Sequence, residues 1–397
     1  MDSHQFMIYS ILKLGRWVVF CGMGLVLSLC FAACSPQSST NTTEKMATCT
    51  SDFPILDAET PFPPAGYTGP FYTGPLFDSD MQLGDSGSNG HDLDQLISNM
   101  DRNNVVRGLM MFGINASDEF DLQAGSNEGI DHMRNAIVKA PCRIIPYFVR
   151  GTGNPDSLEI AYMTTVLDTV QSRYSGQLLR GIGELEIYKP SWGKLDADDP
   201  QLLAIYDLAN TRGLHIMAHW AGGPDSVGPL TSEEARTTSE KNHLATIFEQ
   251  YPNIKFLFHL FPTHIETSIF DLMDTYTNFY FSVDVDHIMQ RIPWECGLLD
   301  CYENDSDAIA KFKAYFDSNF QAMVDQAVAR YKPLIEAHPN QFMWGSENVG
   351  AYSFHPDVYD RSIAFSRAFI AQLSADVREK FAYQNAERVL GSGVKIQ

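Results

Sequence analysis

The sequence predicts an α/β protein built as a (β/α)8 barrel of the TIM type. Eight short apolar runs, each of the length of a buried strand, recur along the chain from residue 76 onward. Stretches with apolar residues at the three- and four-residue spacing of a helix lie between the runs. The centres of successive runs are roughly 25–40 residues apart, the length of one strand–helix unit, except for a longer interval before the last run. Eight such units make a barrel whose usual length of about 250 residues grows with insertions.

The predicted elements alternate along the chain. The expected strands are 76–83, 105–112, 143–149, 179–185, 215–219, 255–259, 279–283 and 342–345. The clearest helices between them are 93–100, 158–170, 202–210, 244–251 and 324–337. A doubly wound open sheet is the alternative architecture. No GxGxxG or GxxxxGK[ST] motif follows the first run, so this alternative lacks its usual ligand signature.

The start of the chain, residues 1–33, is predicted to be a signal peptide. Lys13 and Arg16 precede an apolar run over 17–33, which is shorter than the ~20 residues of a membrane span. Residues 29–34 read LCFAAC, which resembles the lipobox of bacterial lipoproteins. That resemblance implies cleavage before Cys34 and acylation of its thiol. An uncleaved membrane anchor is the alternative, and both interpretations place the body outside the cytoplasm.

The remainder is expected to divide into an anchored lead-in, residues 34–75, and one barrel, residues 76–397, with no second domain. Ser/Thr/Asn/Gln-rich residues 35–50 predict a flexible tether, and a Pro/Gly-rich stretch follows. The residues after Cys34 resemble those of lipoproteins sorted to the outer membrane. We therefore expect a lipid-anchored protein of the bacterial cell envelope, with the lipid bilayer as a partner.

Composition limits the remaining classes of function. Hydrophobic residues make up 44% of the chain, which excludes global disorder. Asp and Glu number 49 against 28 Lys and Arg, a formal net charge of −21. This acid excess disfavours nucleic acid, whose phosphates bind basic surfaces. A small-molecule substrate is the expected partner, and the sequence leaves the oligomeric state open.

The cysteines point to disulfide formation and not to a cysteine metal site. No pair has a CxxC spacing. Cys296 and Cys301 share one loop and are the favoured pair, with Cys49 and Cys142 also present and the connectivity open. The surrounding loop, 285–308, follows the seventh strand and is either a lid over the site or an unrelated surface excursion.

Polar residues follow most of the apolar runs, where the active site of a barrel lies. They include Asp78, Asp80, Gln82, Glu184, Glu186, His219, His259, Asp284, Asp286, His287 and Glu347. Period-two alternation places Asp78, Asp80 and Gln82 on one side of the first strand. Each residue alone has an ordinary structural explanation as a helix cap, a hydrogen-bonded core group or loop polarity. Together they predict convergence on one point, where carboxylates need a cation or a proton to offset their repulsion.

Four short segments resemble motifs of a known family. They read FDSDMQ at 77–82, MDRNNV at 100–105, GSE at 345–347 and NAERVL at 385–390. In order and spacing they resemble the amidohydrolase superfamily, in its amidohydrolase-related (amidohydrolase 2-like) branch of hydrolases and decarboxylases. The resemblance covers about residues 76–392 and implies a barrel enzyme with a divalent metal.

The metal site that the resemblance implies is only partly kept. The family's first strand normally supplies His-x-His, and these positions hold Asp80 and Gln82. The histidines of strands five and six match His219 and His259, and the strand-four carboxylate matches Glu184. The first-strand motif is therefore altered while the other ligand positions remain.

The strand-eight carboxylate of the family shuttles a proton, and Glu347 holds that position. In the intact mechanism a metal lowers the pKa of bound water to about 7, and this carboxylate takes the proton and returns it to the leaving group. A mixed oxygen and nitrogen site suited to Zn or Mn would comprise Asp80, Glu184, His219, His259 and Glu347. If the first-strand change abolished metal binding, Glu347 or Asp80 would act as a carboxylate base.

Three further residues are candidates for substrate binding. Arg150, at the end of the third strand, and Lys189, just past the fourth, could hold an anionic substrate, and either is equally well a surface charge. Gln82 could contact substrate or bind a metal weakly through its carbonyl oxygen.

The sequence thus favours a membrane-anchored, metal-assisted hydrolase of a C–N or C–O bond in a small molecule. A metal-independent lactonase- or decarboxylase-like enzyme on the same scaffold is the first alternative. A non-catalytic envelope binding protein on a degenerate barrel is the second. A nuclease is disfavoured by the acid excess and by the missing first-strand histidines.

Overall fold

The computed structural model describes residues between 44 and 396 of the chain, with gaps. The chain divides into Met1–Asn41 and Thr42–Gln397, and every described residue belongs to the second unit. The described ranges are 44–49, 63–64, 66–82, 93–113, 128–149, 160–175, 177–187, 195–220, 233–259, 267–284, 306–348 and 351–396. The predicted signal peptide and Cys34 lie outside them. Within these ranges no helix has the length and apolar character that crossing a membrane requires.

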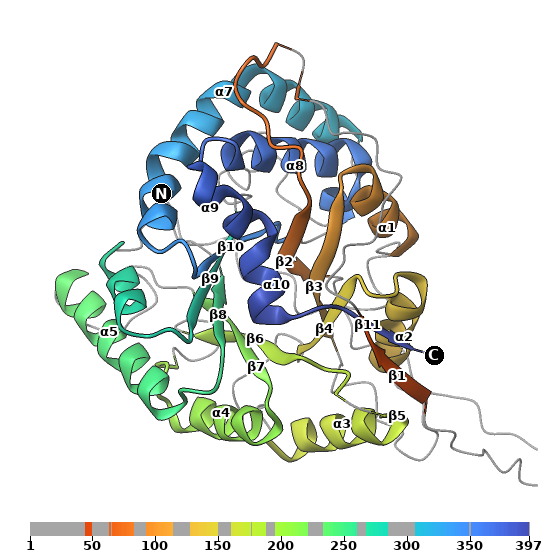
Figure 1. Ribbon diagram of the computed structural model, residues 1–397, viewed down its shortest axis with the longest axis vertical. Helices are drawn as coiled ribbons and strands as arrows, with labels where there is room; N and C mark the ends of the chain where they lie inside the picture. Colours follow the sequence, from red (N-terminus) through yellow and green to blue (C-terminus); the bar gives the residue numbers. More distant parts are fainter. Residues whose placement is uncertain are drawn as a thin grey trace, which may run out of the picture. The chain divides into compact units, whose positions relative to one another are not determined.

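Eight parallel strands form the central sheet, which confirms the predicted (β/α)8 barrel (Figure 1). They are β2 (Leu76–Gln82), β3 (Val105–Gly113), β4 (Ile144–Val149), β6 (Gly181–Ile187), β7 (His215–Trp220), β8 (Phe256–His259), β9 (Phe279–Asp284) and β10 (Phe342–Gly345). Their spatial order follows the sequence order. The two end strands meet where the Glu347 N–H donates to the Asp80 carbonyl at 2.9 Å, and where Met81 forms a parallel bridge with Asn348.

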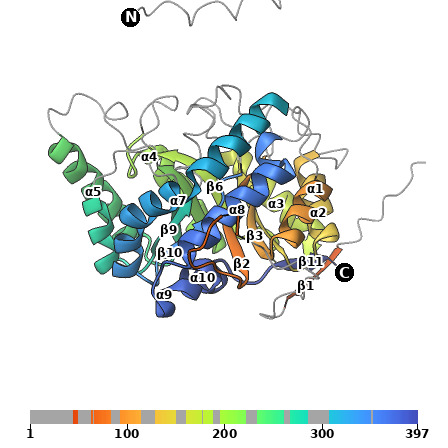
Figure 2. The same cartoon turned by 90° about the horizontal axis from the view of Figure 1, so that it is seen from above.

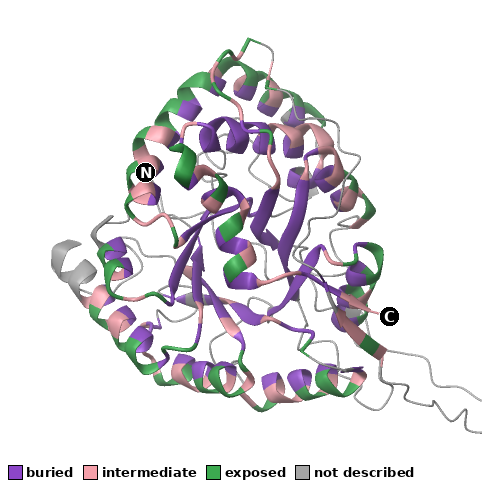
Figure 3. Cartoon of the chain, in the orientation of Figure 1, coloured by how far each residue is buried: buried purple, intermediate pink, exposed green. Residues whose placement is uncertain are grey.

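Helices follow the strands and surround them (Figures 1 and 2). They are α1 (Leu93–Arg102), α2 (Glu128–Lys139), α3 (Ile160–Arg173), α4 (Pro200–Arg212), α5 (Glu233–Gln250), a 3₁₀ helix (Thr267–Asp274), α7 (Ser306–Ala337) and α8 (Pro356–Ile370). The long α7 accounts for the wide interval before the eighth strand. Figure 3 shows the strands buried and the helices exposed on their outer sides, as the alternating sequence pattern requires.

Apolar side chains fill both sides of the barrel wall. The strand residues that point inward include Phe77, Tyr147, Met217, Leu257 and Met343, and they pack with one another. The other face of each strand packs under the helices in a larger cluster. Because both faces are buried, the strands read as continuous apolar runs, which made them recognisable in the sequence.

A C-terminal helix closes the N-terminal end of the barrel. After α9 (Ala375–Glu379) and a π-helical turn (Lys380–Gln384), α10 (Asn385–Leu390) packs against the inward-facing residues. Asn385 Nδ2 donates to the carbonyl of Phe342, the first residue of β10, at 2.8 Å. Lys255, just before β8, donates from Nζ to the Val389 carbonyl at 2.6 Å. The segment that resembles the family's closing helix therefore plugs the end opposite the strand carboxyl termini (Figure 1).

A small second sheet joins the first and last described segments. In it β1 (Glu44–Thr48) pairs antiparallel with β11 (Val394–Ile396) and parallel with β5 (Tyr174–Ser175). We predicted a flexible tether over 35–50, but residues 44–48 are a strand. Main-chain pairing to β11 orders them, and so short a strand has no periodic signal of its own.

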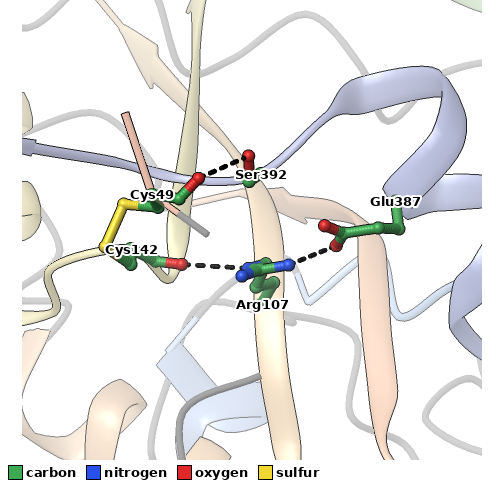
Figure 4. Close-up of a disulfide and its surroundings, with 5 residues drawn as sticks. All are labelled: Cys49, Arg107, Cys142, Glu387 and Ser392. Carbon is green, nitrogen blue, oxygen red and sulfur yellow. Dashed lines mark hydrogen bonds and ion pairs between the residues drawn. A yellow bond between two sulfur atoms is a disulfide. The ribbon is translucent and has the colours of Figure 1, made fainter. Parts of the chain in front are cut away.

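A disulfide fixes this segment to the barrel by joining Cys49 to Cys142 (Figure 4). The sequence had left this pairing open, and the favoured pair, Cys296 with Cys301, lies outside the described residues. Arg107, whose side chain is fully buried in β3, donates from Nε to the Cys142 carbonyl at 3.0 Å and forms an ion pair with Glu387 of α10. Ser392 donates to the Cys49 carbonyl at 3.2 Å. The disulfide, β3 and α10 are thus linked at one end of the barrel.

Candidate functional site

His259, at the end of β8, lies between two carboxylates. Its Nδ1 is 2.7 Å from Asp80 Oδ2, and its Nε2 is 3.2 Å from Glu184 Oε1. The side chains of Asp80 and His259 are completely buried. One imidazole therefore has each of its two nitrogens beside a different carboxylate oxygen.

Glu184 continues the series toward His219. Glu184 Oε1 lies 2.5 Å from His219 Nδ1, and the rings of His219 and His259 have their centroids 5.3 Å apart. The Glu184 and His219 side chains keep 12% and 13% of their surface exposed, whereas Asp80 and His259 keep none. The group therefore opens to solvent at its Glu184–His219 end, at the carboxyl ends of the strands.

Three of these residues could hold a metal together. One ligand atom from each of Glu184, His219 and His259 lies within 4.8 Å of the other two. Asp80 and Glu347 do not belong to this three-residue group. Asp80 lies behind His259, in contact with the ring nitrogen that faces away from Glu184. The structure thus brings four of the five predicted ligands together. Three of them, Glu184, His219 and His259, converge, and the fourth, Asp80, contacts the far side of the His259 ring.

The position of Glu184 depends on an irregularity in β6. The pairing of β6 with β7 shifts register between Ile182 and Leu185. Gly183 has φ +155°, and a Cβ there would lie 2.4 Å from the Met217 carbonyl oxygen. Only glycine permits this close approach of the two strands. The result places Glu184 beside His219, while Leu185 packs in the outer apolar cluster.

A similar irregularity in β2 positions Asp80. The pairing of β2 with β3 shifts between Asp78 and Met81. Strict alternation does not continue through this shift, so the prediction that Asp78, Asp80 and Gln82 lie on one side loses its basis in the strand pattern. Ser79, between the two aspartates, hydrogen-bonds to Ser282 Oγ at 2.7 Å and to the Trp344 carbonyl at 2.8 Å.

Asp78 has a separate, structural environment. Its Oδ1 accepts hydrogen bonds from the backbone N–H groups of Ser346 at 2.9 Å and of Asp80 at 3.1 Å. Burial raises the pKa of Asp78 well above its usual range and the nearby Asp80 raises it further, although the hydrogen bonds oppose this rise. Burial therefore disfavours the charged form of Asp78, and its two hydrogen bonds brace β2 against the residues that follow β10. Nothing in the sequence pattern distinguishes this structural role from that of a site residue.

Electrostatics favour an ionised Glu184. Burial alone would raise the pKa of Glu184, but the positive charge of His259 and the hydrogen bonds from His219 and His259 outweigh it and hold that pKa well below its usual range. A carboxylate between two imidazoles stays anionic, which is the form that binds a metal.

Glu347 lies directly beside the first strand. Its backbone N–H donates to the Asp80 carbonyl, and only 5% of the residue is exposed. Its φ of +46° is uncommon for a residue with a side chain, and such conformations cluster at functional sites. The backbone thus fixes Glu347 next to Asp80, at the end of the barrel where His219 and His259 lie.

The side chains of the other predicted site residues lie outside the described part of the structure. Gln82 ends β2 with its backbone paired to Met111, but its side chain lies outside the described part of the structure. Arg150, Lys189, Cys34 and most of the 285–308 loop also lie outside it, so their predicted roles are untested.

A protein-family model described as amidohydrolase matches residues 163–392. Among solved structures, dihydroorotase from Campylobacter jejuni is 14% identical with a TM-score of 0.45, over 83% of this chain and 87% of that one. An uncharacterised TIM-barrel protein from Bordetella bronchiseptica is 12% identical with a TM-score of 0.45, over 80% and 98%. No curated protein matches the sequence.

Proposed function

The chain belongs to the amidohydrolase family, and from this we propose that it is a metal-assisted hydrolase of a C–N or C–O bond in a small molecule. The observation that carries the proposal is the convergence of Glu184, His219 and His259 at the carboxyl ends of β6, β7 and β8. This is the end of a barrel at which active sites form.

The chemistry of the donor set fits a divalent metal. Two imidazoles and one ionised carboxylate are ligands that Zn binds, and Mn accepts the same mixed set. The contact of His259 Nδ1 with Asp80 matches the carboxylate–histidine pairs that orient metal-binding imidazoles. When bound, the metal would supply Lewis acidity and lower the pKa of a water to about 7.

The protein's own residues would then divide the work. Glu184, His219 and His259 bind the metal. Asp80 fixes the tautomer and direction of the His259 ring through Nδ1, so it is a positioning residue. Glu347 takes a proton from the attacking water and returns it to the leaving group. Arg150, Lys189 and Gln82 remain proposed contacts for the substrate.

We test the metal site by measuring bound Zn and Mn in the purified protein before and after reconstitution. Wild type should hold close to one equivalent, and His219→Asn should lose most of it. His243→Asn is the matched control, because His243 also contacts a carboxylate, Asp198, at 2.6 Å but lies outside the site. Less than about a tenth of an equivalent in reconstituted wild type would contradict the metal proposal.

A metal-independent reaction is the second candidate, and the Asp80–His259 contact favours it. A buried carboxylate beside an imidazole is also an arrangement used for general-base catalysis. In that case protein stripped of metal by a chelator keeps its turnover in a screen of esters, lactones, amides and carboxylic acids. A binding protein gives no turnover in the same screen, and ligands raise its melting temperature.

The envelope location is a further part of the proposal. The lipobox-like residues before Cys34 support lipid anchoring in the bacterial outer membrane. Cells given a labelled fatty acid should label the wild-type protein, while Cys34→Ser should stay unlabelled and uncleaved. Labelling of the serine variant would contradict acylation at this residue.

A further inference from the structure

A cavity of about 220 Å³ lies at the N-terminal end of the barrel, opposite the candidate active site. Four basic residues line it, together with Gln177, Gly213 and residues 389–392 at the end of α10. The basic residues are Arg180, His215, Lys255 and Arg388. Three of them stand at the beginnings of β6, β7 and β8, and the fourth comes from α10. The barrel and its closing helix both contribute to this cluster.

The basic side chains in this cavity repel one another. No Asp or Glu lines it in the part of the chain that the structure describes. Burial lowers the pKa of Lys255, and the charges of Arg388 and Arg180 lower it further. Burial and the charges of Lys255 and Arg180 lower the pKa of His215 to about 3. Like charges this close together repel, so the cluster is costly unless an anion offsets it.

Hydrogen bonds within the chain explain why some of these basic residues, but not Arg180, occupy the cavity. Lys255 holds α10 through the Val389 carbonyl, and Arg388 donates to the Asn340 carbonyl. His215 Nδ1 lies 2.8 Å from Tyr147 Oη. Arg180 differs, because its Nε is buried with no hydrogen-bond acceptor among the described residues. Most buried polar groups have a hydrogen-bond partner, so water or a bound anion is expected to supply the acceptor for this nitrogen.

We propose that this cavity binds a small phosphate-type oxyanion, held by Arg180, Lys255 and Arg388. Guanidinium groups present planar pairs of donors that match phosphate oxygens, and an ammonium adds a point charge. The volume is below the roughly 300–1,000 Å³ of most ligand pockets, which suits a single small anionic group. Gln177, whose Nε2 donates to the carbonyls of Arg212 and Gly213, forms part of the rim.

The test uses inorganic phosphate with the full-length protein in a chloride buffer at constant ionic strength. Calorimetry should show saturable binding below about 20 mM phosphate, with a matching rise in melting temperature. Arg180→Gln should weaken this binding at least tenfold. Lys311→Gln removes the same charge from an exposed position on α7 and should leave it unchanged.

Arg388→Gln provides a second variant if Arg180→Gln does not fold, because the Arg388 side chain is exposed. It should also weaken phosphate binding, by several-fold. Absence of saturable binding to wild type overturns the proposal, and so does equal binding by wild type and the folded cavity variants. Because the cavity lies at the other end of the barrel from Glu184 and His219, loss of phosphate binding should leave the metal content of the protein unchanged.

Discussion

Asp80 Oδ2 lies 2.7 Å from His259 Nδ1, and both side chains are completely buried. The contact joins the first strand of the barrel to the sixth. It leaves the other imidazole nitrogen, Nε2, facing Glu184. A carboxylate of the first strand therefore contacts a candidate ligand from behind, and its substitution has a defined expected effect.

Asp80→Asn should lower the affinity for Zn or Mn by about 10- to 100-fold, the usual effect of removing a carboxylate that orients a ligand histidine. The amide keeps the shape of the side chain but loses the charge that favours a proton on Nδ1. Competition with a chromophoric chelator measures the change. Equal affinities for the variant and wild type would show that Asp80 does not act through His259.

Asp78→Asn should change the free energy of unfolding by less than about 1 kcal/mol at pH 7, because burial disfavours a charge at this position and the amide oxygen can accept the same two backbone hydrogen bonds. Asp78→Ala removes that acceptor and should cost about 1–3 kcal/mol. Urea denaturation of the two variants compares them. An asparagine variant as unstable as the alanine variant would mean that Asp78 is needed as an anion.

Glu347→Gln should reduce the turnover of any substrate found in the screen by about 10²- to 10⁴-fold, the usual contribution of a general acid–base group. Its metal content should stay the same, since Glu347 is outside the three-residue donor group. Glu249→Gln changes an exposed carboxylate of α5 and serves as the control. Undiminished turnover would remove Glu347 from the mechanism.

His215 should make the protein sensitive to acid. Its pKa is about 3 in the folded state, against about 6.5 when unfolded, so between these values the unfolded chain binds the extra proton. The stability contributed by neutral His215 is complete above pH 6.5 and falls as the pH drops toward 3. The loss is at most about 1.4 kcal/mol per pH unit.

His215→Gln should therefore flatten the fall in melting temperature between pH 6.5 and 4, measured in phosphate-free buffers. Glutamine can still hydrogen-bond to Tyr147 but does not titrate. His243→Gln replaces a histidine outside the cavity and is the comparison. Identical pH profiles for wild type and His215→Gln would exclude His215 as a source of acid sensitivity.

Replacing Cys49 and Cys142 with serine should destabilise the protein by about 2–5 kcal/mol, the range for a disulfide that closes a long loop. The sequence separation of the two cysteines is 93 residues. Urea denaturation with and without reductant measures the effect in wild type. Reductant should have no further effect on the double variant if this bond alone is responsible.

The barrel was predictable because strands buried on both faces leave apolar runs at regular intervals. The fourth strand was expected at 179–185, and β6 spans Gly181–Ile187. This shift of two residues leaves Glu184 on the same strand. The strands β1 and β11 were not predicted, since their order depends on pairing between distant segments. Neither has enough residues to carry a pattern.

The sequence predicted which polar residues end the strands, but not how their side chains contact one another. His219 and His259 stand in regular strands, and the sequence placed them together correctly. The positions of Asp80 and Glu184 depend on register shifts in β2 and β6, which alternation cannot reveal. The structure was therefore needed to tell Glu184, a candidate ligand, from Asp80, which contacts a candidate ligand from behind.

The Cys49–Cys142 bond turns the first two strand–helix units into a covalent ring. Asp80 lies inside this ring, whereas Glu184, His219, His259 and Glu347 all come from the open part of the chain. A cut between β2 and β3 would leave the two pieces attached until the bond is reduced. After such a cut and reduction, only noncovalent contacts would hold the segment that carries Asp80, while the three converging donors would remain on one polypeptide.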